Sequence, residues 1–291
     1  MFKYPKPIIV IAGPTASGKS DFAIKLAKDI NGVIINADSR QIYKEISIGT
    51  AKPSIEEMKE VPHFLYGHIS VKENYNIYRY QKDVEKVLTN LSKEQIPIFV
   101  GGTGLYIDSV VFNYHLSKEE VDKEERGKLN LLSIKELRKL VDPNILKSLN
   151  NSDRNNPVRL IRIIEKNEKR ELRGKELIHK YFVIDIDKEE LNRRIRDRVE
   201  NMIDNGLIEE NINTREEDLN KYPALKTIGY QEFDGYFEKQ KSLDDVKDEI
   251  VKNTSKYAKR QKTWFRRHKH AIWTNDYDLI LAESLKLIKI S

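Results

Sequence analysis

The feature that most constrains the fold of this chain is a glycine-rich segment near its start. Residues 13–20 read GPTASGKS and match the pattern G-x-x-x-x-G-K-[ST] in full. An apolar strand predicted at Pro7–Ala12 precedes this segment, and a helix predicted near Ser20–Ile30 follows it. A loop of this kind between a strand and a helix is typical of phosphate binding. We therefore predict an α/β fold with a P-loop NTPase-like core, a parallel sheet with helices on both faces.

The chemistry of this loop indicates a phosphorylated ligand. Glycine lets backbone N–H groups turn inward, and the helix N-terminus adds a partial positive charge. Lys19 would reach the phosphates, and the Ser20 hydroxyl suits Mg²⁺ as a cofactor. The predicted phosphate-binding residues are Gly13, Pro14, Thr15, Ala16, Ser17, Gly18, Lys19 and Ser20. The motif leaves the ligand open, because ATP is the default and any diphosphate satisfies the same chemistry.

Two further loops are expected beside the first. Strands predicted at Gly32–Ala37 and Pro97–Val100 run directly into Asp38–Gln41 and Gly101–Thr103. Strand-to-helix loops of a parallel sheet lie along one edge, the carboxyl edge, where ligands bind in this class. The three loops should therefore converge.

Asp38 and Thr103 are the candidate catalytic residues at this edge. The Asp38 carboxylate can accept a proton from a nucleophile about 3 Å away. It could instead hold Mg²⁺ through water or cap a helix. The Thr103 hydroxyl could orient the nucleophile, or Gly101–Gly104 could be an ordinary turn.

The pattern changes in the middle of the chain. Residues 113–179 read as helical, highly charged and poor in strand signals. We predict a helical insertion domain there, and a core with C-terminal helices from residues 1–112 and 180–291. Strands predicted at Tyr181–Ile186 and Ala271–Trp273 return to the core.

Composition excludes some kinds of site. The chain has no cysteine, which rules out disulfides and cysteine-ligated metals. His268 and His270 are interpreted as part of an exposed basic loop. The apolar run Ile8–Ala12 is too short to cross a membrane, and Met1–Pro7 is too short for a signal peptide. We expect a cytoplasmic protein without a membrane partner.

Clustered basic residues suggest a polyanionic partner. The net charge is +6, and the segments Arg154–Lys175 and Lys259–His270 are strongly basic. Trp264 beside such charges fits contact with phosphates and unpaired bases, although core packing would also explain it. Arg193–Arg198 could close over the phosphates as a lid or form a solvated face.

Several motifs together resemble the bacterial tRNA dimethylallyltransferase family, also called tRNA isopentenyltransferases. The matching stretches are GPTASGKS (13–20), NADSRQIYKEISIGTAKP (36–53), VGGTGLYI (100–107), NPVRLIRIIE (156–165), IGYQEF (228–233) and YAKRQKTWFR (257–266). They occur in the order typical of the family and span nearly the whole chain. DSRQIY followed by GTAKP is far more specific than the glycine-rich loop alone.

The resemblance implies a prenyl transfer. The loop would hold the pyrophosphate of dimethylallyl diphosphate, and the five-carbon group would pass to N6 of adenosine 37 in tRNA. Asp38 would act as base, Thr103 would hold the amine, and the helical insertion would help to clasp the anticodon arm.

The match also implies a set of tRNA contacts. They are Asp38, Ser39, Arg40, Gln41, Thr103, Arg126, Val158, Arg159, Leu160, Ile161, Arg162, Lys226, Gly229, Tyr230, Gln231, Lys259, Arg260, Gln261, Trp264 and Arg266. Two departures bear on this set. Lys226 stands where some relatives carry arginine, which would lose a bidentate contact, and Ser255-Lys256 replaces an Arg-Gln pair.

Three other functions share parts of these motifs. A small-molecule kinase using ATP would share the loop and Asp38 but leaves the basic clusters unexplained. An isopentenyltransferase acting on free nucleotide would need no RNA surface. A non-catalytic RNA-binding module would leave the loop unused. We expect a monomer with no obligate protein partner.

Overall fold

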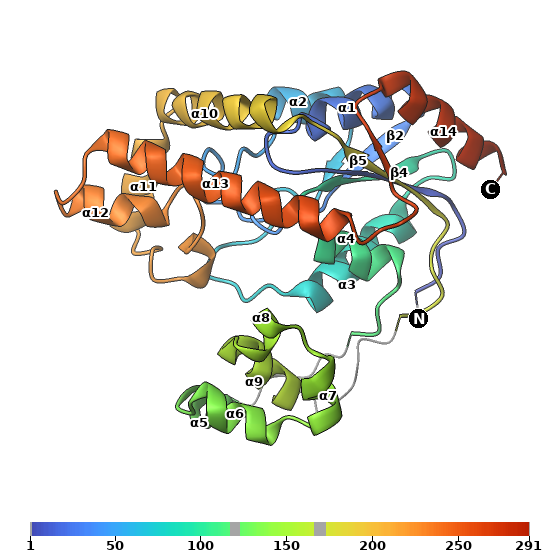
Figure 1. Ribbon diagram of the computed structural model, residues 1–291. Helices are drawn as coiled ribbons and strands as arrows, with labels where there is room; N and C mark the ends of the chain where they lie inside the picture. The colour runs from blue at the N-terminus through green and yellow to red at the C-terminus, as the bar shows by residue number, and fades with distance from the viewer. Residues whose placement is uncertain (1, 117–122, 166–172, 291) are drawn as a thin grey trace. The chain divides into compact units, whose positions relative to one another are not determined.

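The computed structural model describes residues 2–116, 123–165 and 173–290 (Figure 1). Lys166, Lys169 and Arg170 of the predicted basic segment lie outside the described residues. No helix in the described part of the chain is both long enough and apolar enough to cross a membrane.

A six-stranded sheet forms the centre of the larger part of the molecule. Its order is β3-β2-β4-β1-β5-β6, and every neighbouring pair is parallel. The strands are β1 (Ile8–Ala12), β2 (Gly32–Asn36), β3 (His63–Phe64), β4 (Ile96–Gly101), β5 (His179–Ile184) and β6 (Ile272–Thr274). The predicted α/β fold with a parallel sheet is confirmed.

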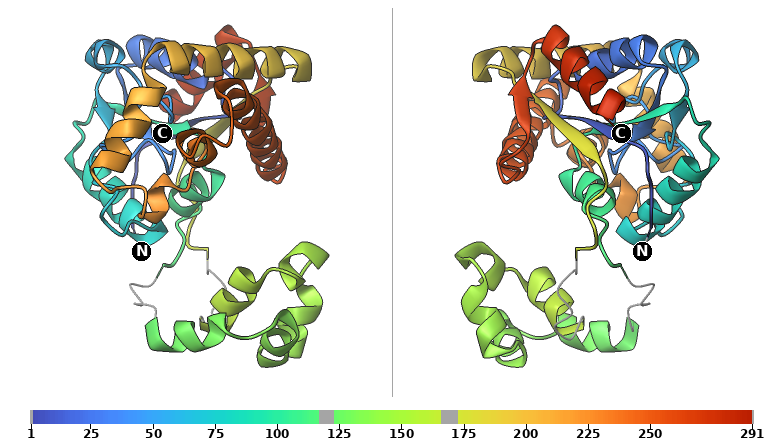
Figure 2. Two further views of the ribbon diagram at one scale, coloured as in Figure 1. Left: turned by 90° about the vertical axis from the view of Figure 1, so that its left-hand side faces the viewer. Right: turned by 90° about the vertical axis from the view of Figure 1, so that its right-hand side faces the viewer.

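Helices cover both faces of the sheet, which explains why its central strands are apolar on both sides (Figure 2). On β1, Ile9 and Ile11 pack toward α1 (Lys19–Asp29) and α14 (Tyr277–Ile290). Alternate residues such as Val10 belong to the opposite cluster. That cluster includes residues of α3 (Ile77–Asn90), α4 (Gly104–Val111) and α13 (Leu243–Phe265).

The remaining helices of this part lie between the strands or after β5. They are α2 (Ile55–Glu60), α10 (Lys188–Asp204), α11 (Leu207–Glu216), α12 (Asp234–Phe237) and the short 3₁₀ turns Pro223–Leu225 and Gln231–Phe233. Both α10 and α13 are long, and they pack against each other (Figure 1).

The chain divides into two compact units. One unit comprises Met1–Asn113 with Lys175–Ser291, and the other is Tyr114–Gly174. The second unit therefore ends five residues before the predicted boundary at 179. Backbone hydrogen bonds explain the difference, because Leu177 N–H donates to Val111 and Ile178 accepts from Ile8, each at 2.9 Å.

The smaller unit is helical throughout its regular structure. It contains α5 (Lys123–Asn130), α6 (Ile134–Leu140), α7 (Pro143–Ser148), α8 (Asn151–Arg154) and α9 (Pro157–Glu165). Its core is built around Leu137 and Leu160, both 0% exposed. A capping box at Ser133 and Glu136 begins α6.

Candidate active site

The glycine-rich loop Gly13–Gly18 joins β1 to α1. Gly18 has φ +83°, a left-handed conformation that glycine adopts without steric cost, and α1 begins at the next residue. A Cβ on Gly13 would lie 2.8 Å from the Ser17 Oγ, so the loop closes tightly on itself. That Ser17 Oγ is buried and has no hydrogen-bond partner among the described residues. The loop thus presents an unused polar atom next to a helix N-terminus.

Two cations lie at this loop. The Lys19 ammonium donates to the Pro14 carbonyl at 3.3 Å, and the Arg198 Nη1 donates to the Thr15 hydroxyl at 3.0 Å. Burial lowers the pKa of Lys19 to about 8, although nearby Asp38 opposes this shift. Burial also lowers the pKa of Arg198. A bound anion would offset the cost of burying both charges.

Asp38 follows β2 and lies within electrostatic range of both cations. Its Oδ1 accepts a hydrogen bond from the Arg40 backbone N–H at 2.9 Å, which orients the carboxylate within a tight turn. The carboxylate lines a cleft beside the glycine-rich loop. Asp38 therefore has the position that a proton acceptor at this cleft requires.

Thr103 connects the loop after β4 to the Asp38 loop. Its Oγ1 accepts from the Ser39 N–H at 3.0 Å and donates to the Ser39 hydroxyl at 3.2 Å. The Thr103 hydroxyl also lies close to the side chain of Tyr257 on α13. Burial raises the pKa of Tyr257, and Asp38 raises it further, so Tyr257 is a neutral phenol at this site. The sequence interpretation did not identify Tyr257.

A buried amide holds Asp38 in place. The Asn36 side chain accepts from the Asp38 N–H at 2.8 Å and donates to the Asp38 carbonyl at 3.1 Å. It also donates to the Leu65 carbonyl at 2.9 Å. Asn36 is 0% exposed, and its own carbonyl accepts from the Tyr80 hydroxyl at 3.0 Å.

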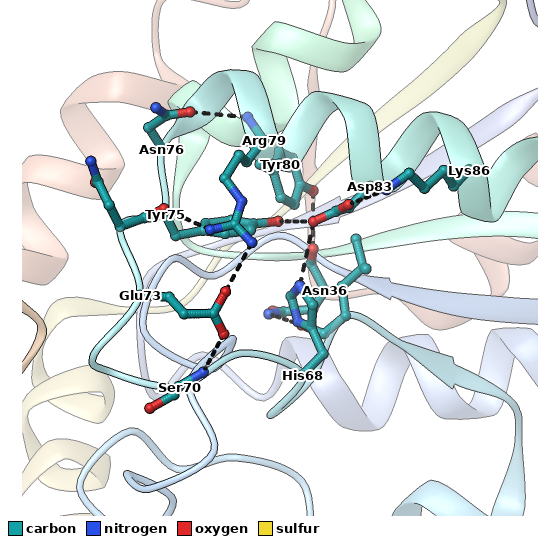
Figure 3. Close-up of polar contacts among 12 residues, drawn as sticks. Asn36, His68, Ser70, Glu73, Tyr75, Asn76, Arg79, Tyr80, Asp83 and Lys86 are labelled. Carbon is teal, nitrogen blue, oxygen red and sulfur yellow. Dashed lines mark hydrogen bonds and ion pairs between the residues drawn. The ribbon is translucent and has the colours of Figure 1, made fainter. Parts of the chain in front are cut away.

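Figure 3 shows how α3 holds Asn36. The Tyr80 hydroxyl points toward Asn36, and Asp83 lies further along the same helix. Asp83 accepts from the Tyr75 hydroxyl at 3.1 Å and lies 3.7 Å from His68. The position of Asp38 therefore depends on Asn36, which Tyr80 in turn holds.

The cleft has a volume of about 300 Å³. Its polar wall carries residues from the Asp38 loop, the segment 226–231 and α13. Its apolar wall consists of Ile195, Val199, Met202, Ile228 and Ile250. Ile195, Val199 and Met202 follow one another on α10 at intervals of about one helical turn. This spacing is visible in the sequence, but residues of an ordinary helix core would show the same spacing.

The arginine cluster Arg193–Arg198 on α10 was predicted either to close over the phosphates or to form a solvated face, and its members divide between the glycine-rich loop and solvent. Arg198 contacts the glycine-rich loop, and Arg194 reaches the Ser17 carbonyl at 3.5 Å. Arg193 instead pairs with Glu190 and Asp197 on an exposed face. The helix thus places one side of the cluster at the loop and the other in solvent.

Comparison with known proteins identifies the family. Residues 41–268 match the model of the family described as IPP transferase. The chain belongs to this family.

Relatives and solved structures agree. The tRNA dimethylallyltransferase of Thermosipho melanesiensis is 39% identical, with 96% of this chain and 97% of the relative covered. The enzyme of that name from Thermoanaerobacter pseudethanolicus is 36% identical over 93% and 92%. The tRNA isopentenylpyrophosphate transferase of Bacillus halodurans has a TM-score of 0.73 at 31% identity, covering 98% and 96%. A eukaryotic dimethylallyltransferase acting on tRNA has a TM-score of 0.78 at 27% identity, covering 94% and 74%.

The predicted RNA contacts fall into several environments. Those that line the cleft are Asp38, Ser39, Arg40, Lys226, Gln231 and Arg260. Those with exposed side chains on α9 of the smaller unit are Val158, Arg159 and Arg162. Lys259 and Arg266 lie on another face of α13, away from the cleft. Arg126 pairs with Glu165 within the smaller unit.

Other members of that set serve the fold. Leu160 and Ile161 are buried in the core of the smaller unit. Tyr230 is 2% exposed, and its hydroxyl donates to Glu210, while Gly229 is also buried. Gln41 donates to the carbonyls of residues 50 and 51.

Gln261 and Trp264 connect α13 to other parts of the site by hydrogen bonds. The Gln261 side chain accepts from the Thr15 N–H and donates to the Gly102 carbonyl, both at 2.9 Å. Trp264 Nε1 donates to Asp108 at 2.9 Å. Gln261 is 4% exposed, so its amide links two loops of the site from within.

The interpretation of His268 as part of an exposed loop is wrong. Its side chain is 11% exposed and lies 3.1 Å from the Asp108 carboxylate. It also stacks on Tyr181, with ring centroids 4.8 Å apart. The cause is tertiary, because the turn after α13 folds back against α4 and β5. His270 is exposed, as predicted.

We expect pyrophosphate binding to weaken as the pH rises above about 8, where Lys19 loses its proton. A hydrogen bond to a charged group contributes about 1.5–3 kcal/mol, so the loss should be about tenfold or more. Lys19→Arg keeps its charge and should bind with a flatter pH profile, measured by calorimetry at pH 7 and 9.5. Parallel profiles for the two proteins would contradict this assignment.

We also expect Asn36→Ala to loosen the Asp38 loop. Leaving buried groups unpaired costs about 1–3 kcal/mol, which corresponds to amide exchange about 5- to 150-fold faster at residues 38–40. Tyr80→Phe is the control, because it retains the ring and the Asn36 amide contacts. Hydrogen–deuterium exchange of both variants tests this, and equal exchange rates in Asn36→Ala and wild type would refute it.

Proposed function

We propose that this chain transfers the dimethylallyl group of dimethylallyl diphosphate to N6 of adenosine 37 in tRNA, releasing pyrophosphate. The observation that carries the proposal is the cleft itself. It joins a cationic phosphate-binding end at Arg198 to a carboxylate, Asp38, and to an aliphatic wall. The relatives named tRNA dimethylallyltransferase support this reaction.

The diphosphate fits the glycine-rich loop. Lys19 and Arg198 would neutralise its charge, and the unpartnered Ser17 hydroxyl could donate to a phosphate oxygen. The aliphatic residues on α10 suit the five-carbon chain, which gains from leaving water. The aliphatic wall offers no hydrogen-bond partners to the polar groups of a nucleoside. Dimethylallyl diphosphate therefore fits the whole cleft better than ATP.

Magnesium fits the same end of the cleft. Among the described residues, no cluster of three or more acidic or histidine side chains could hold a metal alone. The ion would therefore be coordinated mainly by substrate phosphates and water, to which the Ser20 hydroxyl would add one ligand. Bound there, Mg²⁺ would supply positive charge to the leaving diphosphate.

In the proposed transfer reaction, Asp38 accepts the proton that N6 loses. The N6 lone pair attacks C1 of the dimethylallyl group, and the C1–O bond breaks with its electrons leaving on pyrophosphate. The amine proton passes to the Asp38 carboxylate. Thr103 would hold the amine, because its hydroxyl already lies between Ser39 and Tyr257. Lys19 and Arg198 would stabilise the charge that grows on the leaving group.

The adenosine must leave its stack to reach the cleft, which is least costly in a loop of single-stranded RNA. Arg40, Lys226, Gln231 and Arg260 line the cleft and would contact the RNA around that base. On the smaller unit, exposed Arg159 and Arg162 lie one turn apart on α9 and would contact the anticodon arm. The chain would act as a monomer.

Transfer of labelled dimethylallyl diphosphate to unmodified tRNA tests the function. We expect label in tRNA, and none when adenosine 37 is replaced by guanosine. ATP serves as the rival donor and AMP as the rival acceptor. Label in AMP would place the chain among isopentenyltransferases of free nucleotides, and phosphoryl transfer from ATP would identify a kinase.

Asp38→Asn should lower turnover by about 10²–10⁴, the usual contribution of a general base. The amide nearly preserves the volume of the side chain, so affinity for tRNA should stay within about twofold of wild type. Single-turnover rates and equilibrium binding separate the two effects. A rate close to wild type would show that the proton goes elsewhere.

A further inference from the structure

A second concave surface lies on the other side of α13 from the cleft. It is a groove of about 810 Å³ between α10 and α13, and we call it the α10–α13 groove. Tyr257 and Arg260 line the cleft, whereas Lys256 and Lys259 line the groove. Neighbouring residues of a helix point in directions about 100° apart, so the helix separates the two surfaces.

The charge of this groove is strongly one-sided. From α10 it receives Lys188 and Arg196. From α13 it receives Lys252, Lys256, Lys259, Lys262 and Arg266. Asp248 is the only carboxylate among its lining residues. The resulting excess of six positive charges equals the net charge of the whole chain, so all the other residues together are formally neutral.

These cations differ from others on the same helices. Arg193 pairs with Glu190 at 2.8 Å, and Lys247 pairs with Glu200 at 2.7 Å. Within the described ranges, no ion pair joins a groove cation to a carboxylate. Six of the seven cationic side chains are exposed, and Lys262 donates to the Ile186 carbonyl. The floor contains aliphatic Leu191 and Val251, which supply no counter-charge.

The arrangement fits a chain of anions better than a single one. Lys252, Lys256, Lys259 and Arg266 follow one side of α13 over a length of about 20 Å, at 1.5 Å per residue. A lone phosphate would meet only one or two of them. A nucleic acid backbone offers regularly spaced phosphates along such a row, and their capture releases counterions.

We propose that the α10–α13 groove is a second RNA-binding surface, which holds consecutive backbone phosphates of the same tRNA whose adenosine enters the cleft. The identity of the RNA rests on the function proposed above. The surface adds Lys188, Arg196, Lys252 and Lys256 to the residues that contact RNA. Phosphate contacts of this kind position the RNA without reading its sequence.

The test is a triple variant, Arg196→Gln with Lys252→Gln and Lys256→Gln. None of these side chains lines the cleft. The control is Lys59→Gln with Lys72→Gln and Lys93→Gln, which removes the same charge from exposed positions that make no ion pair in the part of the chain that the structure describes. Binding of unmodified tRNA is titrated at several KCl concentrations without dimethylallyl diphosphate, and turnover is measured at saturating tRNA.

We expect the triple variant to bind tRNA at least tenfold more weakly at low salt. The slope of log affinity against log salt should become shallower by about 2–3, since each of the three lost contacts removes about 0.7–0.9. Turnover at saturating tRNA and the thermal unfolding midpoint should match wild type. The control should keep the wild-type slope.

An unchanged slope in the triple variant, or no binding of tRNA by wild type, would overturn the proposal. If the triple variant lost binding to a polyglutamate peptide but bound RNA as wild type does, the groove would instead be a site for an acidic protein partner, and the proposal would be overturned. The titration contains no prenyl donor, so a wild-type protein that binds tRNA but transfers nothing would refute the proposed reaction and leave the groove result standing.

Discussion

The candidate site depends on the parallel pairing of β1 with its neighbours. Ala12 is in register with Gly101 of β4 and Val183 of β5, and Asn36 of β2 is in register with Val100. The strands therefore end together, and the loops that follow them must share one edge. Buried aliphatic side chains on both faces make any slip of this register costly.

Helix α13 completes the site at that edge. Gln261 bonds to the glycine-rich loop and to the loop after β4, and Tyr257 reaches Thr103 between them. Near the end of the helix, Trp264 bonds to Asp108, which also faces His268. The same helix presents the cleft on one side and a row of lysines on another, because each turn distributes residues around its axis.

Electrostatics distinguishes the two surfaces. At and beside the cleft, the partly buried Lys19 and Arg198 lie near one carboxylate, so charge is concentrated where water screens it less than at an open surface. In the α10–α13 groove the cations are mostly exposed, and their effect on a partner depends on salt. The first arrangement suits a small diphosphate held at a fixed place, and the second suits a long polyanion.

The sequence by itself determined five of the six strands, the glycine-rich loop and the placing of Asp38 and Thr103 at the ends of strands, whereas the two-residue strand β3 was not predicted. Apolar runs, glycine spacing and strand-to-helix order are local properties that can be read along the chain. The tertiary structure alone decided that Arg198 meets Thr15, that Gln261 lies inside the protein and that the His268 side chain is mostly buried. Arg198 and Thr15 are 183 residues apart in sequence, and their contact exists only because α10 packs over the loop. Periodicity likewise could not separate Lys259 from Arg260, because which face of α13 meets the core depends on the packing of distant segments.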